Sequence, residues 1–192
     1  MAKLCTSLLR YTKEIRADKA FMDAGEANRR EGCNNMAFMF FNRYLDLYEA
    51  IEDPDCGITD NSDFQETDIP SPQDIPLPEK NLIGVEERDN IRDWVLNMNM
   101  NANCDKGLSM RNCENCGNEI YEAALSCQHC RCTWEPCIVS GYPLVKSQAI
   151  SCKICGKGAI RDYWNDYISN TMHCPWCKSM QTPYWETNLS LN

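Results

Sequence analysis

The sequence lacks the features that direct a chain into or across a membrane. No apolar run in its 192 residues approaches the roughly 18 residues that a membrane-spanning helix needs. The first residues, M-A-K-L-C-T-S, lack the apolar core and the small-residue cleavage site of a secretory signal. We therefore expect a soluble protein of a reducing compartment, without membrane insertion. In such a compartment cysteine pairs favour metal binding over disulfides.

The sequence also lacks a basic patch. The formal net charge is -9, and no Lys or Arg lies among the acidic residues between Asp53 and Glu79. Nucleic-acid binding usually requires basic side chains that displace counterions from the phosphates. This charge argues against a zinc-ribbon protein that binds DNA or RNA.

Histidine is scarce as well, with two residues in the chain. There is no H-E-x-x-H motif, and the H-x-E and P-C-x-x-C combination of the zinc deaminases is absent. A catalytic zinc normally keeps one coordination position open, whereas thiolates here suffice to saturate two sites. We expect a structural metal, no catalytic residues and no enzymatic activity.

Cysteine, in contrast, is abundant, with 14 residues. Eight of them form four Cys-x-x-Cys pairs, and two such pairs complete one tetrahedral thiolate site. The sequence thus predicts two structural Zn²⁺ ions. The predicted ligands are Cys113, Cys116, Cys127, Cys130, Cys152, Cys155, Cys174 and Cys177. Possible substitute ligands are Cys132, Cys137 and His129, and His173 is expected to be a surface neighbour of Cys174.

The spacing does not decide which pairs share a metal ion. Sequential pairing joins the first two pairs and the last two, whereas interleaved pairing closes longer loops. The extra loop-closure entropy is only about 1 kcal/mol per site, which favours sequential sites without deciding between them. Cys5, Cys33, Cys56 and Cys104 stand apart from the pairs and are expected to be small core residues or free thiols.

Residues 1–52 are expected to form helices at the end of a tetratricopeptide-like solenoid. Apolar spacing predicts one helix from Lys3 to Ile15, with Leu4, Leu8, Tyr11 and Ile15 on one face. Two more helices are predicted, from Asp18 to a C-cap at Gly32 and from Asn34 or Asn35 to Ile51. These two helices have the repeat's small and aromatic residues, namely Phe21, Ala24, Gly25, Ala37 and Phe41. The alternative is an ordinary helical hairpin. Because such repeats need neighbours to bury a core, we expect a longer protein with more solenoid upstream.

The remaining segments follow from composition. Residues 53–84 are acidic and rich in proline, which predicts an extended connector whose apolar residues lie along a surface. Residues 85–106 are predicted to form a helix and a hinge, 107–180 the zinc-binding domain and 181–192 a tail. Within the domain, a hairpin or irregular turn is expected over 118–126. A helix is expected from Ala159 to Ile168, with the aromatic stripe that includes Trp164 as its core.

Several longer runs resemble one known family. They are N-N-M-A-F-M-F-F-N-R-Y-L-D-L, D-N-S-D-F-Q-E-T-D-I-P, I-R-D-W-V-L, Y-E-A-A-L-S-C-Q-H-C and E-P-C-I-V-S-G-Y-P. They are similar to the C-terminal end of the intraflagellar transport protein 172 family. The resemblance implies upstream β-propellers and a long solenoid. It also implies membership of complex B, which moves with motors to build and maintain cilia, and location at the cilium and its base.

The family's tail resembles a U-box or RING domain. Cys137–Gly141 is similar to the opening loop of a U-box, and the helix with Trp164 is similar to its central helix; the Cys/His pair that a RING needs before Cys152 is missing. The predicted fold is therefore an α-helical solenoid end followed by a small α+β zinc-binding domain of zinc-ribbon or U-box-like type. The expected function is a scaffold whose zinc-stapled domain binds partners, namely other intraflagellar transport subunits. The alternative is a module that binds ubiquitin or an E2. The candidate partner surface is Ile138, Tyr142, Pro143 and Trp164.

Overall fold

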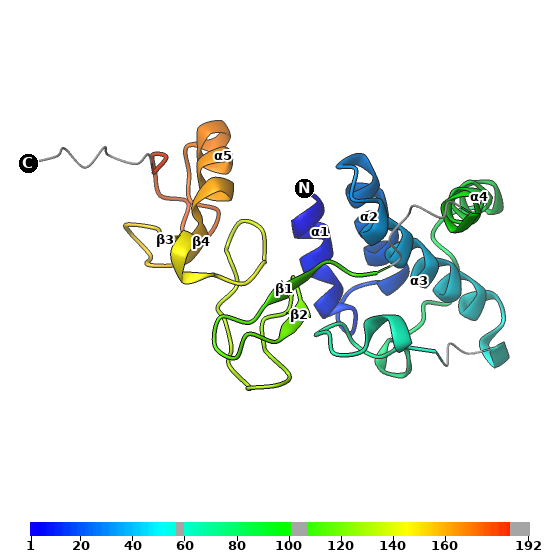
Figure 1. The fold of residues 1–192 in the computed structure, drawn as a ribbon. Coiled ribbons are helices and arrows are strands. Elements are labelled where there is room, and N and C mark those ends of the chain that lie inside the picture. Colours follow the sequence, from blue (N-terminus) through cyan, green and yellow to red (C-terminus); the bar gives the residue numbers. More distant parts are fainter. Residues whose placement is uncertain (57–59, 101–106, 185–192) are drawn as a thin grey trace, which may run out of the picture.

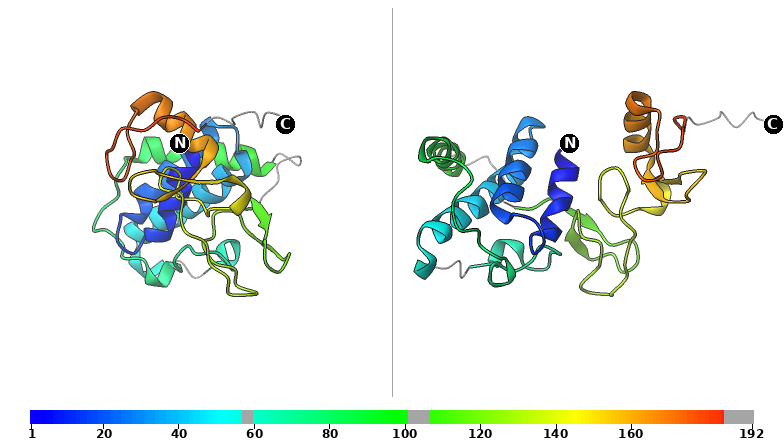
Figure 2. Two further views of the ribbon diagram at one scale, coloured as in Figure 1. Left: turned by 90° about the vertical axis from the view of Figure 1, so that its left-hand side faces the viewer. Right: turned by 180° about the vertical axis from the view of Figure 1, so that it is seen from behind.

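The computed structural model describes residues 1–56, 60–100 and 107–184. The predicted hinge, Cys104 and most of the predicted tail lie outside these residues. A helical part forms one end of the molecule, a first cysteine-rich hairpin lies beside α1, and β3, β4 and α5 form the other end (Figures 1 and 2). The α-helices are α1 (Ala2–Leu8), α2 (Ala17–Arg30), α3 (Asn34–Glu52), α4 (Val85–Met100) and α5 (Arg161–Thr171). Among the described helices, none combines the length and apolar content needed to cross a bilayer.

Helices α2 and α3 form a closely packed antiparallel hairpin, as the small residues predict. A Cβ atom built on Gly25 would lie 2.5 Å from Cδ1 of Phe41, so glycine is what lets the Phe41 ring lie against the α2 backbone. Gly32 ends α2 with φ +78°, and the Cys33 N–H donates to the Asn28 carbonyl. The predicted glycine C-cap is therefore confirmed.

The first helix is shorter than predicted. Helix α1 ends at Leu8, and a 3-10 turn, Leu9–Tyr11, follows it instead of a continuous helix to Ile15. The buried residues of this segment include Ala2, Thr6 and Leu9. The stripe of large apolar side chains faces solvent, each 37–45% exposed; it consists of Leu4, Leu8, Tyr11 and Ile15. We call this set the α1 stripe.

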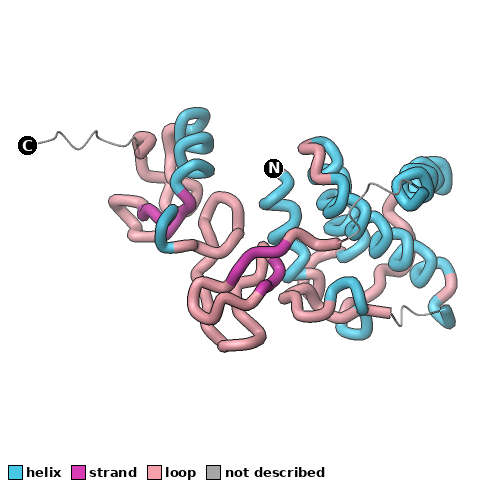
Figure 3. The backbone as a smooth tube through the Cα atoms, in the orientation of Figure 1, coloured by secondary structure: helices cyan, strands magenta, loops and turns pink. Residues whose placement is uncertain are grey.

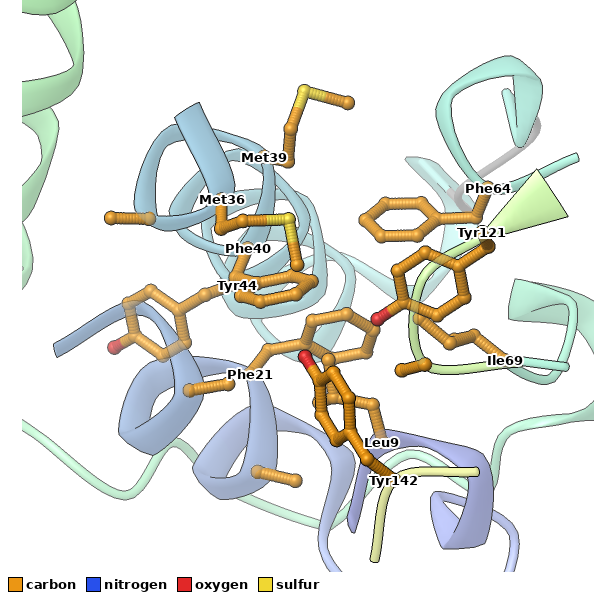
Figure 4. Close-up of a cluster of buried hydrophobic side chains, with 14 of the residues drawn as sticks. Leu9, Phe21, Met36, Met39, Phe40, Tyr44, Phe64, Ile69, Tyr121 and Tyr142 are labelled. Atoms are coloured by element: carbon orange, nitrogen blue, oxygen red, sulfur yellow. The ribbon is translucent and has the colours of Figure 1, made fainter. Parts of the chain in front are cut away.

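The acidic connector packs onto the helical part. It contains 3-10 turns at Pro54–Cys56, Ser62–Phe64 and Pro72–Asp74. Phe64, Ile69 and Ile75 are buried, as expected for apolar residues that lie along a surface, while Leu77 is exposed. The Phe64 ring meets the Phe21 ring edge-on at 5.7 Å, and Figure 4 shows Phe64 beside this aromatic core. Apolar burial thus anchors a segment whose described residues, 53–56 and 60–84, include no α-helix or strand.

Helix α4 also lies where the sequence predicts it. Ile91 and Val95 are buried, and the Trp94 ring meets the Phe41 ring edge-on at a centroid distance of 5.4 Å. The packing role that apolar spacing predicts for this helix is confirmed.

The cysteine-rich part consists mostly of turns (Figure 3). Strands β1 (Met110–Asn112) and β2 (Glu119–Tyr121) form one antiparallel hairpin, and β3 (Ala149–Ser151) and β4 (Gly158–Ile160) form another; a 3-10 turn, Lys146–Gln148, precedes β3. Residues 159 and 160 belong to β4, so α5 begins two residues later than predicted. Trp164 of α5 is fully buried.

One arginine ties the helical part to the cysteine-rich part. Arg10 is 8% exposed at its side chain, and it donates to Asp68 of the connector (3.1 Å). Its other two nitrogens donate to the carbonyls of Gly141 (2.8 Å) and Ala123 (2.7 Å). Nearby, Lys3 forms an ion pair with Glu122 at 2.9 Å. Helix α1 and its 3-10 turn therefore fix the position of the first hairpin.

Candidate metal centres

Each Cys-x-x-Cys pair lies in a turn of one repeated geometry, which we call a knuckle. The first cysteine's N–H donates to the carbonyl five residues on, and the N–H four residues on donates back to the cysteine's carbonyl. The residues that flank each turn pair as in a hairpin, seven positions apart. Five turns share this pattern: knuckle 1 (113–118), knuckle 2 (127–132), knuckle 3 (137–142), knuckle 4 (152–157) and knuckle 5 (174–179).

The fourth residue after the first cysteine has positive φ in all five knuckles. Three are glycines, which take this conformation at little steric cost. The other two are Arg131 (φ 61°) and Lys178 (φ 60°), where the turn imposes the left-handed conformation on an ordinary residue. The glycines after Cys116 and Cys155 are thus placed as their motif predicts, at φ 75° and 70°.

Knuckles 4 and 5 bring the last two cysteine pairs together. The sulfurs of Cys152, Cys155, Cys174 and Cys177 all lie within 4.8 Å of one another. The Sγ–Sγ distance is 3.8 Å from Cys152 to Cys177 and 3.9 Å from Cys155 to Cys174. These two pairs are sequential neighbours, so the arrangement is sequential rather than interleaved.

Knuckles 1 and 2 gather five cysteines instead of four. Cys113, Cys127, Cys130 and Cys132 form a group whose sulfurs lie within 4.8 Å of one another. Cys116 is more exposed, with its Sγ 3.7 Å from that of Cys127. Four members of this cluster were predicted as ligands, and the fifth, Cys132, was a predicted substitute.

Both clusters fit the geometry of a tetrathiolate zinc site. A Zn–S bond of about 2.3 Å in a tetrahedron separates neighbouring sulfurs by about 3.8 Å. The Sγ–Sγ distances given above for the predicted ligands match this separation in both clusters, and the sulfurs of Cys113 and Cys130 are also 3.7 Å apart. Cys132 lies closer, 3.5 Å from Cys113 and 3.3 Å from Cys130. The chain therefore has two cysteine clusters of the kind that binds zinc, and the first cluster has one sulfur more than a zinc ion takes.

Hydrogen bonds prepare several of these sulfurs for metal. The side chain of Asn115 contributes most to lowering the pKa of Cys130, to about 5, and that of Ser179 to lowering the pKa of Cys177, to about 6. Burial acts against the charged form of Cys113, but the N–H groups of Cys116 and Asn115 outweigh it, and the pKa of Cys113 is lowered.

Burial and hydrogen bonds to neighbouring cysteines raise the pKa of Cys116 and Cys132 to about 12 and that of Cys155 to about 11. Each cluster without metal is therefore a mixture of thiolates and thiols, and zinc must displace the protons of the thiols.

Knuckle 3 has the same turn without a second cysteine. Ser140 stands at that position, and the buried Cys137 sulfur accepts N–H groups from Val139 (3.4 Å) and Ile160 (3.3 Å). Cys137 belongs to neither cluster. The sequence did contain a signal for this turn, namely Gly141 four residues after the cysteine. Among the other candidates, His129 is exposed and outside both clusters, and His173 is an exposed neighbour of Cys174, as predicted.

The predicted partner surface is wrong for three of its four residues. Trp164, Tyr142 and Pro143 are buried, because in so small a unit the large aromatic side chains supply the core. Ile138 is half-buried. Two large apolar side chains within the knuckles of the second cluster are exposed instead: Ile154 is 70% exposed and Trp176 is 64% exposed. Both occupy the position just before the second cysteine of their pair.

A family model described as the second zinc finger domain of IFT121 matches residues 135–182, which contain knuckles 3, 4 and 5. Among curated proteins, the intraflagellar transport protein 172 homolog of Rattus norvegicus is 40% identical over 181 residues, 93% of this chain and 10% of that protein. Intraflagellar transport protein 172 of Chlamydomonas reinhardtii is 40% identical over 168 residues, 85% of this chain and 10% of that protein. Intraflagellar transport protein osm-1 of Caenorhabditis elegans is 34% identical over 151 residues, 76% of this chain and 8% of that protein.

The match to the Rattus norvegicus protein covers nearly the whole of this chain. The chain spans about a tenth of the length of the relatives it matches. It is therefore homologous to one segment of the intraflagellar transport 172 proteins.

Proposed function

We propose that this chain is a non-enzymatic scaffold and interaction segment of the intraflagellar transport complex B. In this proposal it acts in cilium assembly, at the cilium and its base, and its two zinc ions are structural. Homology to intraflagellar transport 172 proteins supports the pathway. The thiolates of each cluster saturate a zinc ion, which leaves no open position for a substrate and supports a structural metal.

The observation that carries the scaffold role is the uncovered α1 stripe. Its four apolar side chains lie on one side of the segment and face solvent. Beside them is a groove of about 250 Å³ lined in part by Cys5, Leu8 and Ala20. An apolar helix face of this kind is suited to packing against another helix. We propose that a further helical unit of tetratricopeptide-like type covers the stripe, which extends the α2–α3 packing into a longer scaffold.

The second contact surface of the proposal lies on the second zinc cluster. Ile154 and Trp176 project from knuckles 4 and 5, and the Lys157 ammonium lies 5.2 Å from the centre of the Trp176 ring. A zinc ion that joins the two knuckles would hold this apolar pair in a fixed geometry. An exposed aromatic side chain on a rigid support is a common centre of a protein interface.

The two surfaces can be tested separately. In a pull-down from ciliated cells, Ile154→Glu with Trp176→Glu should reduce recovery of transport-train components. Leu4→Glu with Leu8→Glu, made in the longer protein, should weaken its assembly. Leu96→Glu is the matched control, because Leu96 is an equally uncovered apolar residue on α4, 52% exposed. Equal recovery by all variants, or no train component with the wild type, would refute the proposal.

The zinc content has its own measurement. Native mass spectrometry should find two zinc ions per chain, and strong chelation should unfold residues 107–180 while α2 and α3 retain their helical signal. A chain without zinc, or one linked by disulfides, contradicts this part of the proposal. Cys155→Ser should remove one ion, since it breaks the second cluster alone.

A ubiquitin-binding or E2-binding module of U-box type is the second candidate. The observation that favours it is the Cys137–Gly141 loop, a knuckle closed without a second cysteine, with Ile138 half-exposed on it. Titration of the chain into isotope-labelled ubiquitin, repeated with Ile138→Ala, tests the idea. If the ubiquitin spectrum does not shift and the chain shows no autoubiquitination, the ubiquitin- or E2-binding module is excluded.

A further inference from the structure

The two metal clusters are built as repeats, which allows residue-by-residue comparison. Knuckles 1 and 2 correspond to knuckles 4 and 5, so the Cys113–Cys130 pair (3.7 Å) matches Cys152–Cys177 (3.8 Å). The carbonyl that closes knuckle 2 belongs to Cys132, and the one that closes knuckle 5 belongs to Ser179. The two clusters therefore place a thiol and a hydroxyl at the same position.

The side chains at this position lie in the same place relative to the metal ligands. The Ser179 hydroxyl is 3.0 Å from the Cys177 sulfur and 4.0 Å from the Cys152 sulfur. The Cys132 sulfur is 3.3 Å from the Cys130 sulfur and 3.5 Å from the Cys113 sulfur. A serine there can only donate a hydrogen bond to a ligand, whereas a cysteine can also replace a ligand.

We propose that the first cluster is a five-thiol zinc centre in which Cys116 and Cys132 exchange as the fourth ligand. Cys113, Cys127 and Cys130 are common to the predicted ligand set and to the closest sulfur group. Cys116 is the exposed member of the cluster and lies against Cys127, whereas Cys132 lies against Cys113 and Cys130. One thiol is therefore always free beside a loaded zinc ion.

The free thiol makes this centre a site of oxidation by hydrogen peroxide. The Cys132 thiol attacks one peroxide oxygen. An S–O bond forms, the O–O bond breaks, and the thiol proton joins the leaving hydroxide to give water. The neighbouring Cys113 thiolate then attacks the oxidised sulfur. An S–S bond forms, the S–O bond breaks and hydroxide leaves. Two cysteines have lost two electrons to the peroxide, and zinc, left with three thiolates, is released.

The second cluster lacks this chemistry because Ser179 neither binds zinc tightly nor reacts with peroxide. The same chain therefore combines an oxidisable zinc centre beside α1 with a resistant one next to the Ile154–Trp176 surface. The inference rests on the proposed binding of zinc by both clusters, and the zinc count of the untreated protein tests that separately.

The exchange is tested by ligand variants and native mass spectrometry. Cys116→Ser should keep two zinc ions, because Cys132 completes the site. Its counterpart Cys155→Ser should keep only one, because Ser179 cannot substitute. Loss of a zinc ion from Cys116→Ser, with two ions in the wild type, overturns the exchange while leaving the zinc proposal intact. Absence of zinc from the wild type overturns both.

The oxidation is tested by adding dilute hydrogen peroxide to the two-zinc protein in the presence of a zinc-binding dye. We expect one of the two ions to be released rapidly, with a Cys113–Cys132 disulfide found by peptide mapping. Cys132→Ser should abolish the rapid release of zinc. Ser179→Cys should make the release of both zinc ions rapid. Variants are compared only after native mass spectrometry shows two ions in each. Equal release from both clusters of the wild type, or rapid release from Cys132→Ser, overturns the proposal.

Discussion

Replacing Gly25 by alanine should destabilise the α2–α3 hairpin, although the same change stabilises most helices. In an open helix interior, alanine is favoured over glycine by about 1 kcal/mol. Here the new Cβ would lie 2.5 and 2.6 Å from two carbons of the Phe41 ring. Ordinary carbon contacts are about 3.5–4.0 Å, so the ring or the helix must move by about 1 Å.

The Phe41 ring has little room for that movement. It is fully buried, and the Trp94 ring packs against it edge-on at 5.4 Å. Overpacking of this kind costs about 1–3 kcal/mol, and we expect the upper part of that range because the contact joins two rigid groups. After the helix gain is subtracted, Gly25→Ala should lower the free energy of unfolding by about 1–2 kcal/mol, or the melting temperature by about 2–8 °C.

Chemical denaturation followed by circular dichroism measures this loss in the zinc-loaded protein. Gly84→Ala is the matched control, because its Cβ would meet nothing within 4 Å, and its effect should stay within about 0.5 kcal/mol. In a double-mutant cycle, Phe41→Leu should offset part of the loss, with a coupling of about 1 kcal/mol or more. The reasoning fails if Gly25→Ala is as stable as the wild type, or if its effect is independent of residue 41.

Three further predictions test other parts of the structure. Arg10→Ala should cost about 2–4 kcal/mol in denaturant unfolding, since two carbonyls lose their donor and Asp68 loses its cationic partner, keeping only the Leu125 N–H. Arg10→Lys should restore only part of this loss. A loss below about 0.5 kcal/mol in Arg10→Ala contradicts the role of this contact. Phe64→Ala should cost about 3–5 kcal/mol and expose the connector to limited proteolysis, whereas the exposed Leu77→Ala should do neither. Hydrogen bonding by Ser179 lowers the pKa of Cys177 in the metal-free folded protein to about 6. The Cys177 thiolate therefore contributes to the free energy of unfolding in full above the ordinary cysteine pKa, and this contribution is lost as pH falls through about 6. Iodoacetamide labelling should show Cys177 reactive at neutral pH and slower in Ser179→Ala; equal rates in the two proteins would show that the hydroxyl does not set the pKa.

Local patterns in the sequence were enough to locate the α2–α3 hairpin, α4, most of α5 and the cysteine turns, but not the strands β1, β3 and β4. The hairpin of α2 and α3 follows from small residues at Gly25 and Ala37 with an aromatic residue at 41, because these contacts join neighbouring helices. The cysteine pairs were recognisable for the same reason, since a knuckle is formed within six residues. Sequence patterns are informative where the interacting groups are close together in the chain.

Contacts between distant segments could not be predicted in this way. The partners of Arg10 are Asp68, Ala123 and Gly141, which are separated from it by 58, 113 and 131 positions in the sequence. No periodicity identifies such partners. Periodicity identified the residues of the α1 stripe, but it could not show that they face solvent. An apolar face that packs against a neighbour and one left open have the same spacing. The partner surface failed for a related reason: size and aromaticity mark Trp164 equally as core or as contact residue, and only the packing decides.

Knuckle 3 shows how one backbone turn can serve two purposes in the same chain. Its hydrogen bonds match those of the four cysteine-pair knuckles, but N–H groups satisfy the Cys137 sulfur where a metal would otherwise lie. A Cβ on Gly141 would lie 2.1 Å from the Ser7 hydroxyl, and the Gly141 carbonyl accepts from Arg10. This turn is therefore the one that meets α1 and its 3-10 turn. Ser140, at the position of the second cysteine, is itself buried in this turn. The other four knuckles keep their second cysteine, and we expect bound zinc to supply there the cohesion that α1 and its 3-10 turn supply to knuckle 3.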